Sequence, residues 1–337
     1  MSLLSDRVRR SLRSEFDRSL MAKVGLFLVF LMVTMATFAP FLAPHDPTQQ
    51  GLEESNLPPA GVSQTSDEFR MVDGERQTVT VEKRGTLEHP LGTDSLGRDL
   101  FSRVLFGART SLMVGVFGTL FAVGTGVSVG LTAGYYGGRV DDALMRFADV
   151  MLAVPALVLA IALVGLLGPL TIRIPDPFVA LGLVDGMPET FVFPVTLTIV
   201  VGVVNWVWFA RVARGEALSI RQQEYVKAAR SLGASDRTIL RRHVLPNSLT
   251  PIIVLATIQV AAIILLESSL SFLGFSGTTL SWGFDIAQGR DYLATSWWIS
   301  SIPGLAIVVA VVGINLLGDW LRDALDPGLE GEHGGGM

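Results

Sequence analysis

The stretch SLMVGVFGTLFAVGTGVSVGLTAG, residues 111–134, decides the fold class of this chain. It contains no charged side chain, and it exceeds the roughly 20 apolar residues with which an α-helix crosses the hydrocarbon core of a bilayer. Small residues recur in it at every fourth position and so share one helix face: Gly118, Ala122, Gly126, Gly130 and Gly134. Because such a stripe lets helix backbones approach closely in lipid, the sequence predicts a membrane-spanning helix that packs tightly against another.

Composition extends this prediction to the whole chain. Hydrophobic residues other than Gly make up 50% of the 337 residues, and charged residues make up only 17%, against about 25% in a typical soluble domain. Five further apolar stretches are long enough to cross a bilayer: about 24–43, 147–168, 191–210, 249–274 and 298–318. The first exceeds the usual apolar region of a secretory signal and no A-x-A site follows it, so we expect a retained span. The sequence predicts an all-α membrane protein with six transmembrane helices.

The distribution of positive charge predicts the orientation. If the N-terminus is cytoplasmic, the inner segments hold seventeen Lys and Arg, whereas the short outer loops hold only Arg173 and Arg290. Cytoplasmic loops carry such an excess, so we expect both termini in the cytoplasm. The N-terminal segment 1–23 and the acidic tail 319–337 would then lie on the inner side.

The segment 44–110 is predicted to be an extracytoplasmic loop. The alternating run QTVTVE, residues 77–82, predicts one strand or hairpin arm. Further on, apolar residues from Leu100 to Leu112 recur at helical spacing opposite Arg98, Arg103 and Arg109. This pattern predicts an amphipathic helix that lies in the outer membrane interface and leads into the second span.

Searches for catalytic and cofactor motifs exclude several classes of protein. None of the three Lys is followed by Ser or Thr, so the chain has no Walker A sequence. Without Cys it cannot hold an iron–sulfur cluster or a thiol nucleophile. The four His lie on different segments, and we expect surface or capping roles for them: His45, His89, His243 and His333. We therefore expect no catalytic residue, bound cofactor or metal.

The inner loop EYVKAARSLGASDRTILRRHVLPN, residues 224–247, carries the most informative pattern. It predicts a helix, a break at Gly233 and a second helix capped by Ser235 and ended by Pro246. Small residues lie where a solvated loop would carry long polar side chains: Ala228, Ala229, Gly233 and Ala234. They favour close contact with another protein. The alternative is a solvated basic loop that only satisfies the charge bias of inner segments.

This loop resembles the EAA loop of permease subunits of binding-protein-dependent ABC importers. The resemblance rests on two Ala, a Gly four residues after the second and a Leu-Pro whose Pro is thirteen residues after that Gly: Ala228, Ala229, Gly233, Leu245 and Pro246. The Glu that precedes the two Ala in the motif is Lys227 here, with Glu224 nearby. Five other segments resemble the C-type subunit of dipeptide and oligopeptide permeases: 89–115, 148–161, 265–275, 297–298 and 317–327.

The resemblance implies a type I ABC importer permease fold, with a transmembrane domain over 109–318 and a coupling loop over 224–246. It also implies several partners in a prokaryotic plasma membrane: a second homologous permease subunit, two ATPase subunits that bind ATP and Mg²⁺, and an extracytoplasmic solute-binding protein, with no nucleic acid. The residues expected to contact an ATPase are Glu224, Tyr225, Ala228, Ala229, Gly233 and Ala234. The expected substrate is a di- or oligopeptide, and the alternative is nickel or another small solute.

Two groups of polar residues leave alternatives open. Glu267 is the one acidic residue deep in a predicted span, and such residues usually mark function. It could line the pathway, pair with the partner permease or serve as a capped structural residue near the outer interface. Asp94, Arg98 and Asp99 could form a docking or gating element for the binding protein. In the structural alternative, Asp94 caps the helix that Leu96 begins and pairs with Arg98.

Two other function classes fit the sequence less well. A secondary transporter would normally carry paired buried ionisable groups and internal repeats, whereas Glu267 is alone. A membrane scaffold would not need the EAA-like loop.

The excess of Arg over Lys, 23 to 3, and of acidic over basic residues favours a salt-adapted prokaryote.

Overall fold

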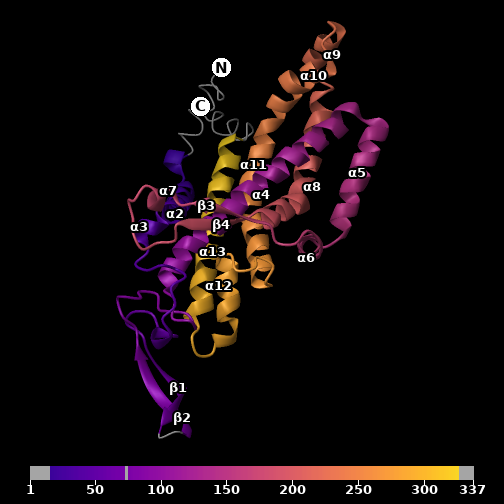
Figure 1. The fold of residues 1–337 in the computed structure, drawn as a ribbon. Coiled ribbons are helices and arrows are strands. Elements are labelled where there is room, and N and C mark those ends of the chain that lie inside the picture. The colour runs from indigo at the N-terminus through magenta and orange to yellow at the C-terminus, as the bar shows by residue number, and fades with distance from the viewer. Residues whose placement is uncertain (1–15, 73–74, 326–337) are drawn as a thin grey trace.

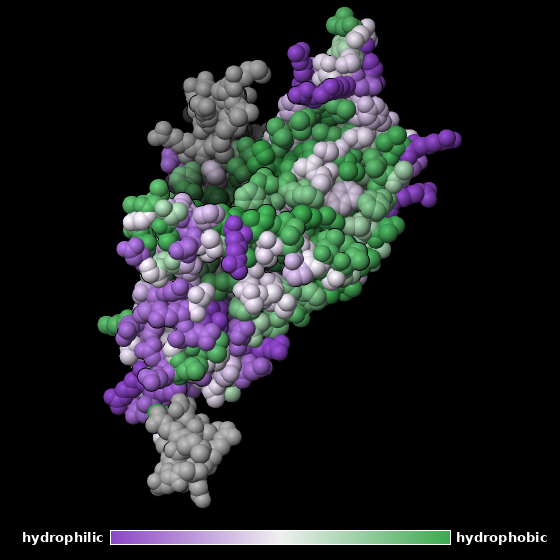
Figure 2. All heavy atoms as spheres, viewed as in Figure 1, coloured by the Kyte–Doolittle hydropathy of each residue, from purple (hydrophilic) through white to green (hydrophobic). Residues whose placement is uncertain are grey.

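The computed structural model describes residues 16–72 and 75–325, which form a mostly helical bundle (Figure 1). Five helices are long and apolar enough to cross a membrane, and a bent pair, α5 and α6, raises the number to six if it counts as one span. The long helices are α2 Leu20–Thr37, α4 Leu100–Tyr136, α8 Val195–Ile220, α11 Leu245–Phe272 and α13 Trp298–Leu325. The predicted helical membrane fold is therefore confirmed for the described residues. Figure 2 shows hydrophobic side chains over much of the helical body, with hydrophilic ones gathered toward its ends.

The small-residue face of α4 packs against α8, as predicted. A Cβ on Gly126 would lie 2.3 Å from the carbonyl oxygen of Trp206, and one on Gly130 would lie 2.2 Å from that of Ala210. Only Gly permits such approach between backbones. These close contacts with α8 extend along α4 from Gly118 to Gly134.

The first and last spans pack together in the same manner. A Cβ on Gly25 of α2 would lie 2.8 Å from the Cβ of Leu316, and one on Gly313 of α13 would lie 2.8 Å from the Cβ of Leu28. The ring of Phe16 meets that of Trp320 with centroids 5.6 Å apart. The described N-terminal end and the end of α13 therefore lie on one side of the bundle, while their cytoplasmic location stays a prediction.

The predicted span 147–168 is not one straight helix. It is divided between α5 Gly138–Ala153 and α6 Ala156–Leu167, whose axes differ by 95°. The break falls at Val154 and Pro155. A Pro disfavours helical backbone in the residue before it and lacks the N–H that would continue the helix, so Pro155 explains the bend.

The inner loop between α8 and α11 differs from its prediction at Pro246. It contains α9 Glu224–Ser231, α10 Asp236–Ile239 and the π-helical turn η2 Leu240–Val244, and η2 continues directly into α11. Pro246 therefore lies in the first turn of α11 and ends no helix. In the π turn the N–H of Leu245 bonds to the carbonyl oxygen of Leu240, five residues back, so the α-helical hydrogen-bond pattern is already interrupted where Pro246, which lacks an N–H, follows.

The outer segment contains short elements and one hairpin. These are α3 Ala39–Leu42, η1 Leu52–Glu54, β1 Ser63–Val72 and β2 Glu75–Arg84. β1 and β2 pair in antiparallel register, so the predicted strand at 77–82 is confirmed as part of β2. A second antiparallel hairpin, β3 Thr171–Pro175 with β4 Thr190–Pro194, flanks α7 Pro177–Ala180 and was not predicted. β4 also occupies the start of the predicted span 191–210.

The predicted interfacial helix at the end of this segment is wrong. α4 begins at Leu100 and continues without a break through the second span. Arg103 and Arg109 do not face solvent, since they are only 2% and 8% exposed. Arg103 forms an ion pair with Asp285 of α12 Trp282–Gly289. These charges are buried because they meet partners on segments that are distant in the sequence.

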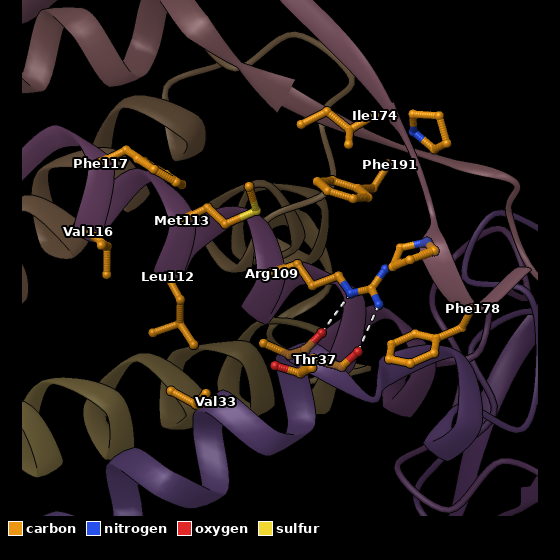
Figure 3. Close-up of a pocket in the computed structure, with 13 residues that line it drawn as sticks. Val33, Thr37, Arg109, Leu112, Met113, Val116, Phe117, Ile174, Phe178 and Phe191 are labelled. Atoms are coloured by element: carbon orange, nitrogen blue, oxygen red, sulfur yellow. Dashed lines mark hydrogen bonds between the residues drawn. The ribbon is translucent and has the colours of Figure 1, made fainter. Parts of the chain in front are cut away.

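Arg109 forms the second of these buried contacts (Figure 3). Its Nε donates to the carbonyl oxygen of Ala36 at 2.6 Å, its Nη2 donates to that of Thr37 at 3.0 Å, and its Nη1 pairs with Asp176. Its guanidinium carbon lies 5.5 Å from the ring centroid of Phe191. Arg109 thereby joins α2, α4 and the β3–β4 hairpin beside a largely apolar cavity of about 610 Å³.

We expect Gly130→Ala to destabilise the bundle by about 1–3 kcal/mol, because the new methyl group meets a backbone carbonyl that cannot move aside. Gly124→Ala is the matched control, since Gly124 lies on the same helix with nothing within 4 Å of its added Cβ. Thermal unfolding of both variants in detergent measures the difference. Equal melting temperatures for the two variants would contradict the tight α4–α8 contact.

Candidate functional site

The helices α9 and α10 project from one end of the bundle, opposite the β1–β2 hairpin (Figure 1). Gly233 joins them with a φ of 84°, a conformation that favours Gly. The backbone N–H of Ala234 donates to the carbonyl oxygen of Ala229 at 3.1 Å and closes the end of α9. Ser235 then caps α10 by accepting from the N–H of Thr238. The predicted helix, turn and capped helix are therefore present.

The outward face of this loop presents most of the residues that were predicted to contact an ATPase. Four are exposed and two are half-buried: Glu224, Tyr225, Ala228 and Gly233, then Ala229 and Ala234. Leu232 was not predicted, although its side chain is 89% exposed at the tip of the loop. Its position directly before the turn Gly was the available signal.

The inward face of the loop is anchored in the hydrophobic core. Val226 and Ile239 are 1% and 0% exposed, and they belong to one cluster with Leu131 of α4, Phe209 of α8 and Ile252 of α11. Burial of side chains of this size contributes about 1.5–3 kcal/mol each. The loop is therefore a packed extension of three long helices and not a free segment.

Tyr135, near the end of α4, joins both helices of the loop. Its hydroxyl donates to Oδ1 of Asp236 at 2.6 Å and accepts from Nη2 of Arg230 at 3.0 Å. The guanidinium of Arg230 also lies 5.4 Å from the Tyr135 ring centroid, and the hydrogen bond to Tyr135 raises the pKa of Arg230 above its usual value. The sequence showed no sign of this contact, because its partners are 95 and 101 residues away.

Glu267 lies in α11 and is completely buried within this chain. Its carboxylate accepts hydrogen bonds from the hydroxyls of Ser111 at 3.0 Å and Ser271 at 2.7 Å, and more weakly from Ser268 at 3.3 Å. Ser111 belongs to α4, so the network fastens α11 to α4. This geometry favours the structural alternative among the three that the sequence left open.

The outer residues Asp94, Arg98 and Asp99 lie close together, but the predicted cap is misplaced. Asp94 closes a turn by accepting from the N–H groups of Leu96 and Arg98 and pairs with the Arg98 side chain, with Nε at 2.6 Å from Oδ2. The helix begins later, at Leu100, and Asp99 caps it by accepting from the N–H of Ser102 at 2.8 Å. The pairing of Asp94 with Arg98 is confirmed.

A buried charge cluster continues from these residues. Arg103 lies 3.7 Å from Asp94 and pairs with Asp285. Burial raises the pKa of Asp285, and the positive charge of Arg103 opposes that change. Beside this cluster, His45, His89 and Asp99 bring their ligand atoms within 4.8 Å of one another, the one such group found among residues 16–72 and 75–325. Only surface or capping roles were expected for His45 and His89 from their positions in the sequence.

Comparison with known proteins establishes the class of this chain. Residues 126–331 match the family described as binding-protein-dependent transport system inner membrane component. Residues 9–59 match the N-terminal TM domain of oligopeptide transport permease C. Because the first match covers more than half of the chain, the chain belongs to the family of inner membrane components of binding-protein-dependent transport systems.

Individual relatives make the resemblance more specific. The chain is 36% identical over 308 residues to the probable D,D-dipeptide transport system permease protein DdpC of Escherichia coli (strain K12), covering 91% of this chain and 87% of that protein. It is 35% identical to the di/tripeptide transport system permease protein DppC of Pseudomonas aeruginosa, covering 91% and 88%. Among solved structures, an inward-facing MetNI methionine ABC transporter aligns with a TM-score of 0.49 at 17% identity, covering 66% of this chain and 96% of that one. The resemblance to peptide permeases is confirmed by these relatives.

We expect Tyr135→Phe to loosen the loop 224–246, because it leaves the hydrogen bonds to Asp236 and Arg230 unmade at a cost of about 1–3 kcal/mol. Hydrogen exchange of residues 224–240 should accelerate at least about fivefold. Tyr136→Phe is the control, because Tyr136 is 52% exposed and its hydroxyl makes no hydrogen bond within the described residues. Identical exchange in both variants would show that the Tyr135 hydroxyl does not hold the loop.

We expect Glu267→Leu to lower the stability of the protein by about 1–3 kcal/mol, since buried serine hydroxyls lose their acceptor. Glu267→Gln keeps one carbonyl acceptor and should lose less. Thermal unfolding in detergent ranks the two variants against wild type, and a Leu variant as stable as wild type would contradict the structural role. Substrate uptake by the Gln variant tests the pathway alternative, which predicts a loss of uptake at unchanged stability.

Proposed function

We propose that this chain forms one half of the translocation pathway of an ATP-driven importer and couples to its ATPases through the loop 224–246. The observation that carries the proposal is a protruding loop whose outer face is exposed and whose inner face is buried in the core of α4, α8 and α11. Membership of the binding-protein-dependent family supports it. ATP and Mg²⁺ would bind to separate partner subunits, because this chain has no Walker A sequence.

The geometry gives a physical route for coupling. Leu232 and Tyr225 are positioned to enter a groove on an ATPase, while Ala228 and Gly233 allow close approach. The anchoring residues Val226 and Ile239 then pass a displacement of the loop to the long helices. Closure of two ATPases on ATP would draw two such loops together and change which side of the membrane the pathway faces.

The proposed substrate is a di- or oligopeptide delivered by an extracytoplasmic binding protein. Support comes from relatives named as D,D-dipeptide and di/tripeptide permeases, each covered over most of its length. Nickel or another small solute is the alternative within the same architecture. A second homologous permease would complete the pathway in the prokaryotic plasma membrane.

Leu232→Asp tests the coupling assignment. Because the Leu232 side chain is 89% exposed, its replacement should not disturb the fold. We expect the ATPase subunits to stop copurifying and ATP-dependent uptake of labelled dipeptides into proteoliposomes to fall at least about tenfold. Leu87→Asp is the control, because Leu87 is equally exposed, at 87%, on the outer segment. It should leave ATPase copurification unchanged.

The outcomes separate the two parts of the proposal. Copurification of ATPases with the Leu232→Asp variant at the wild-type level would sink the coupling assignment. If the wild-type complex binds its ATPases but imports labelled Ni²⁺ and no dipeptide, the coupling stands and the peptide substrate is wrong.

A further inference from the structure

The outer segment brings two histidines and three carboxylates around one small cavity. The cavity, of about 160 Å³, is lined by residues from the chain after α3, from η1 and from the loop that precedes α4. Its ionisable members are His45, Glu54, Glu88, His89 and Asp99. They are separated by up to 54 positions in the sequence, so only the fold assembles them.

His89 and Asp99 are spaced as two ligands of one ion would be, and His45 lies beside them. Nδ1 of His89 lies 2.9 Å from Oδ1 of Asp99, and the His45 and His89 ring centroids are 4.6 Å apart. Two ligand atoms bound to a metal at about 2.0–2.1 Å, at angles between 90° and tetrahedral, are separated by about 2.9–3.4 Å. A metal ion can therefore replace the proton that His89 and Asp99 share. Glu54, with Oε2 at 3.3 Å from Nε2 of His89, faces the other ring nitrogen and would orient the imidazole instead of binding the ion.

One nitrogen atom of the cluster has no hydrogen-bond partner in the described part of the chain. Nδ1 of His45 is buried and makes no hydrogen bond. A buried nitrogen without a partner is costly, and coordination to an ion would satisfy it. The backbone positions this ring, because the N–H of His45 donates to Oγ of Ser102, which in turn donates to Oδ2 of Asp99. Such hydrogen bonds to ligands are typical of the surroundings of metal sites.

The charges of the cluster also favour a cation. Glu54, Glu88 and Asp99 pair only with histidines in the described part of the chain, and none meets Lys or Arg within 4.0 Å. The neighbouring Asp94, in contrast, has Arg98 and Arg103. Three carboxylates beside two imidazoles leave negative charge that a divalent ion would balance.

We propose that His45, His89 and Asp99 bind a divalent transition-metal ion of the Zn²⁺ class on the outer face of the protein. Two imidazole nitrogens and a carboxylate oxygen suit Zn²⁺ and disfavour Mg²⁺ and Ca²⁺, which take oxygen ligands. The ion joins the chain after α3 to the N-terminal cap of α4, so it is a resident ion that stiffens the outer segment and not a transported solute.

Equilibrium dialysis of the full chain in lipid nanodiscs against Zn²⁺, after treatment with chelator, tests the proposal. Purification uses a tag without histidine. We expect one bound Zn²⁺ per wild-type chain, together with a higher melting temperature. We expect binding at least about tenfold weaker for His45→Ala and for His89→Gln. His243→Ala is the control, because His243 lies in η2 at the opposite end and should not affect binding.

Three results would overturn the proposal. The first is that the wild-type chain binds no Zn²⁺ at micromolar concentration, which would leave His89 as a hydrogen-bonded bridge between Asp99 and Glu54. Equal binding by wild type, His45→Ala and His89→Gln would place any ion elsewhere. Tighter binding of Mg²⁺ or Ca²⁺ than of Zn²⁺ would contradict the histidine ligands.

His45 is only half-buried, so its variant should fold, and the melting temperature without metal verifies this. Peptide uptake is a separate readout, so neither proposal depends on the other.

Discussion

The close approach of α4 and α8 is the constraint on which the rest of the structure depends. In lipid, apolar side chains gain little by leaving one apolar environment for another, so helices associate through close packing and polar contacts. Gly126 and Gly130 let the α4 backbone touch α8 directly. The loop 224–246 then packs beneath this pair, and α11 is fastened to α4 by the Glu267 network. A wider separation of α4 and α8 would disturb all of these contacts.

Buried polar contacts fix the outer end of the bundle, where close packing alone would leave the helices free to slide. Arg109 holds α2 and the β3–β4 hairpin to α4, and Arg103 holds α12. The indole N–H groups of Trp282 and Trp298 donate to the carbonyl oxygens of Val104 and Thr93. Burying an arginine or indole N–H group is costly unless the group donates a hydrogen bond. These contacts therefore favour one arrangement of the segment that precedes α4.

The features that the sequence predicted well are those with local signals. The small-residue stripe on α4 and the turn at Gly233 depend on spacing within one helix or loop, and both are present in the structure. Two prolines show the limits of local signals. Pro155 bends the span 147–168, which was predicted as one helix, and Pro246, expected to end a helix, lies inside one.

The errors in the candidate sites have a different cause. Arg103 and Arg109 were placed on a surface because their partners, Asp285 and Asp176, are 182 and 67 residues away. The Tyr135 contact and the His45–His89 pair are likewise long-range. Leu232 was not predicted, because its exposure depends on which side of the loop packs against the bundle and the motif does not include it. The salt-adapted habitat and the cytoplasmic termini remain predictions.

The π turn before Pro246 has a consequence for mechanics. It makes one continuous helix of 37 residues from Asp236 to Phe272, which is about 55 Å long at 1.5 Å per residue. The hydrogen bonds of Glu267 attach this helix to α4 near one end, and Asp236 lies at the other end, in the loop 224–246. If the helix pivots at Glu267, a tilt of about 5° over the roughly 45 Å from Glu267 to Asp236 would shift Asp236 by about 4 Å. A small rotation of the helix about Glu267 would thus displace the loop at the opposite end by about the length of a side chain.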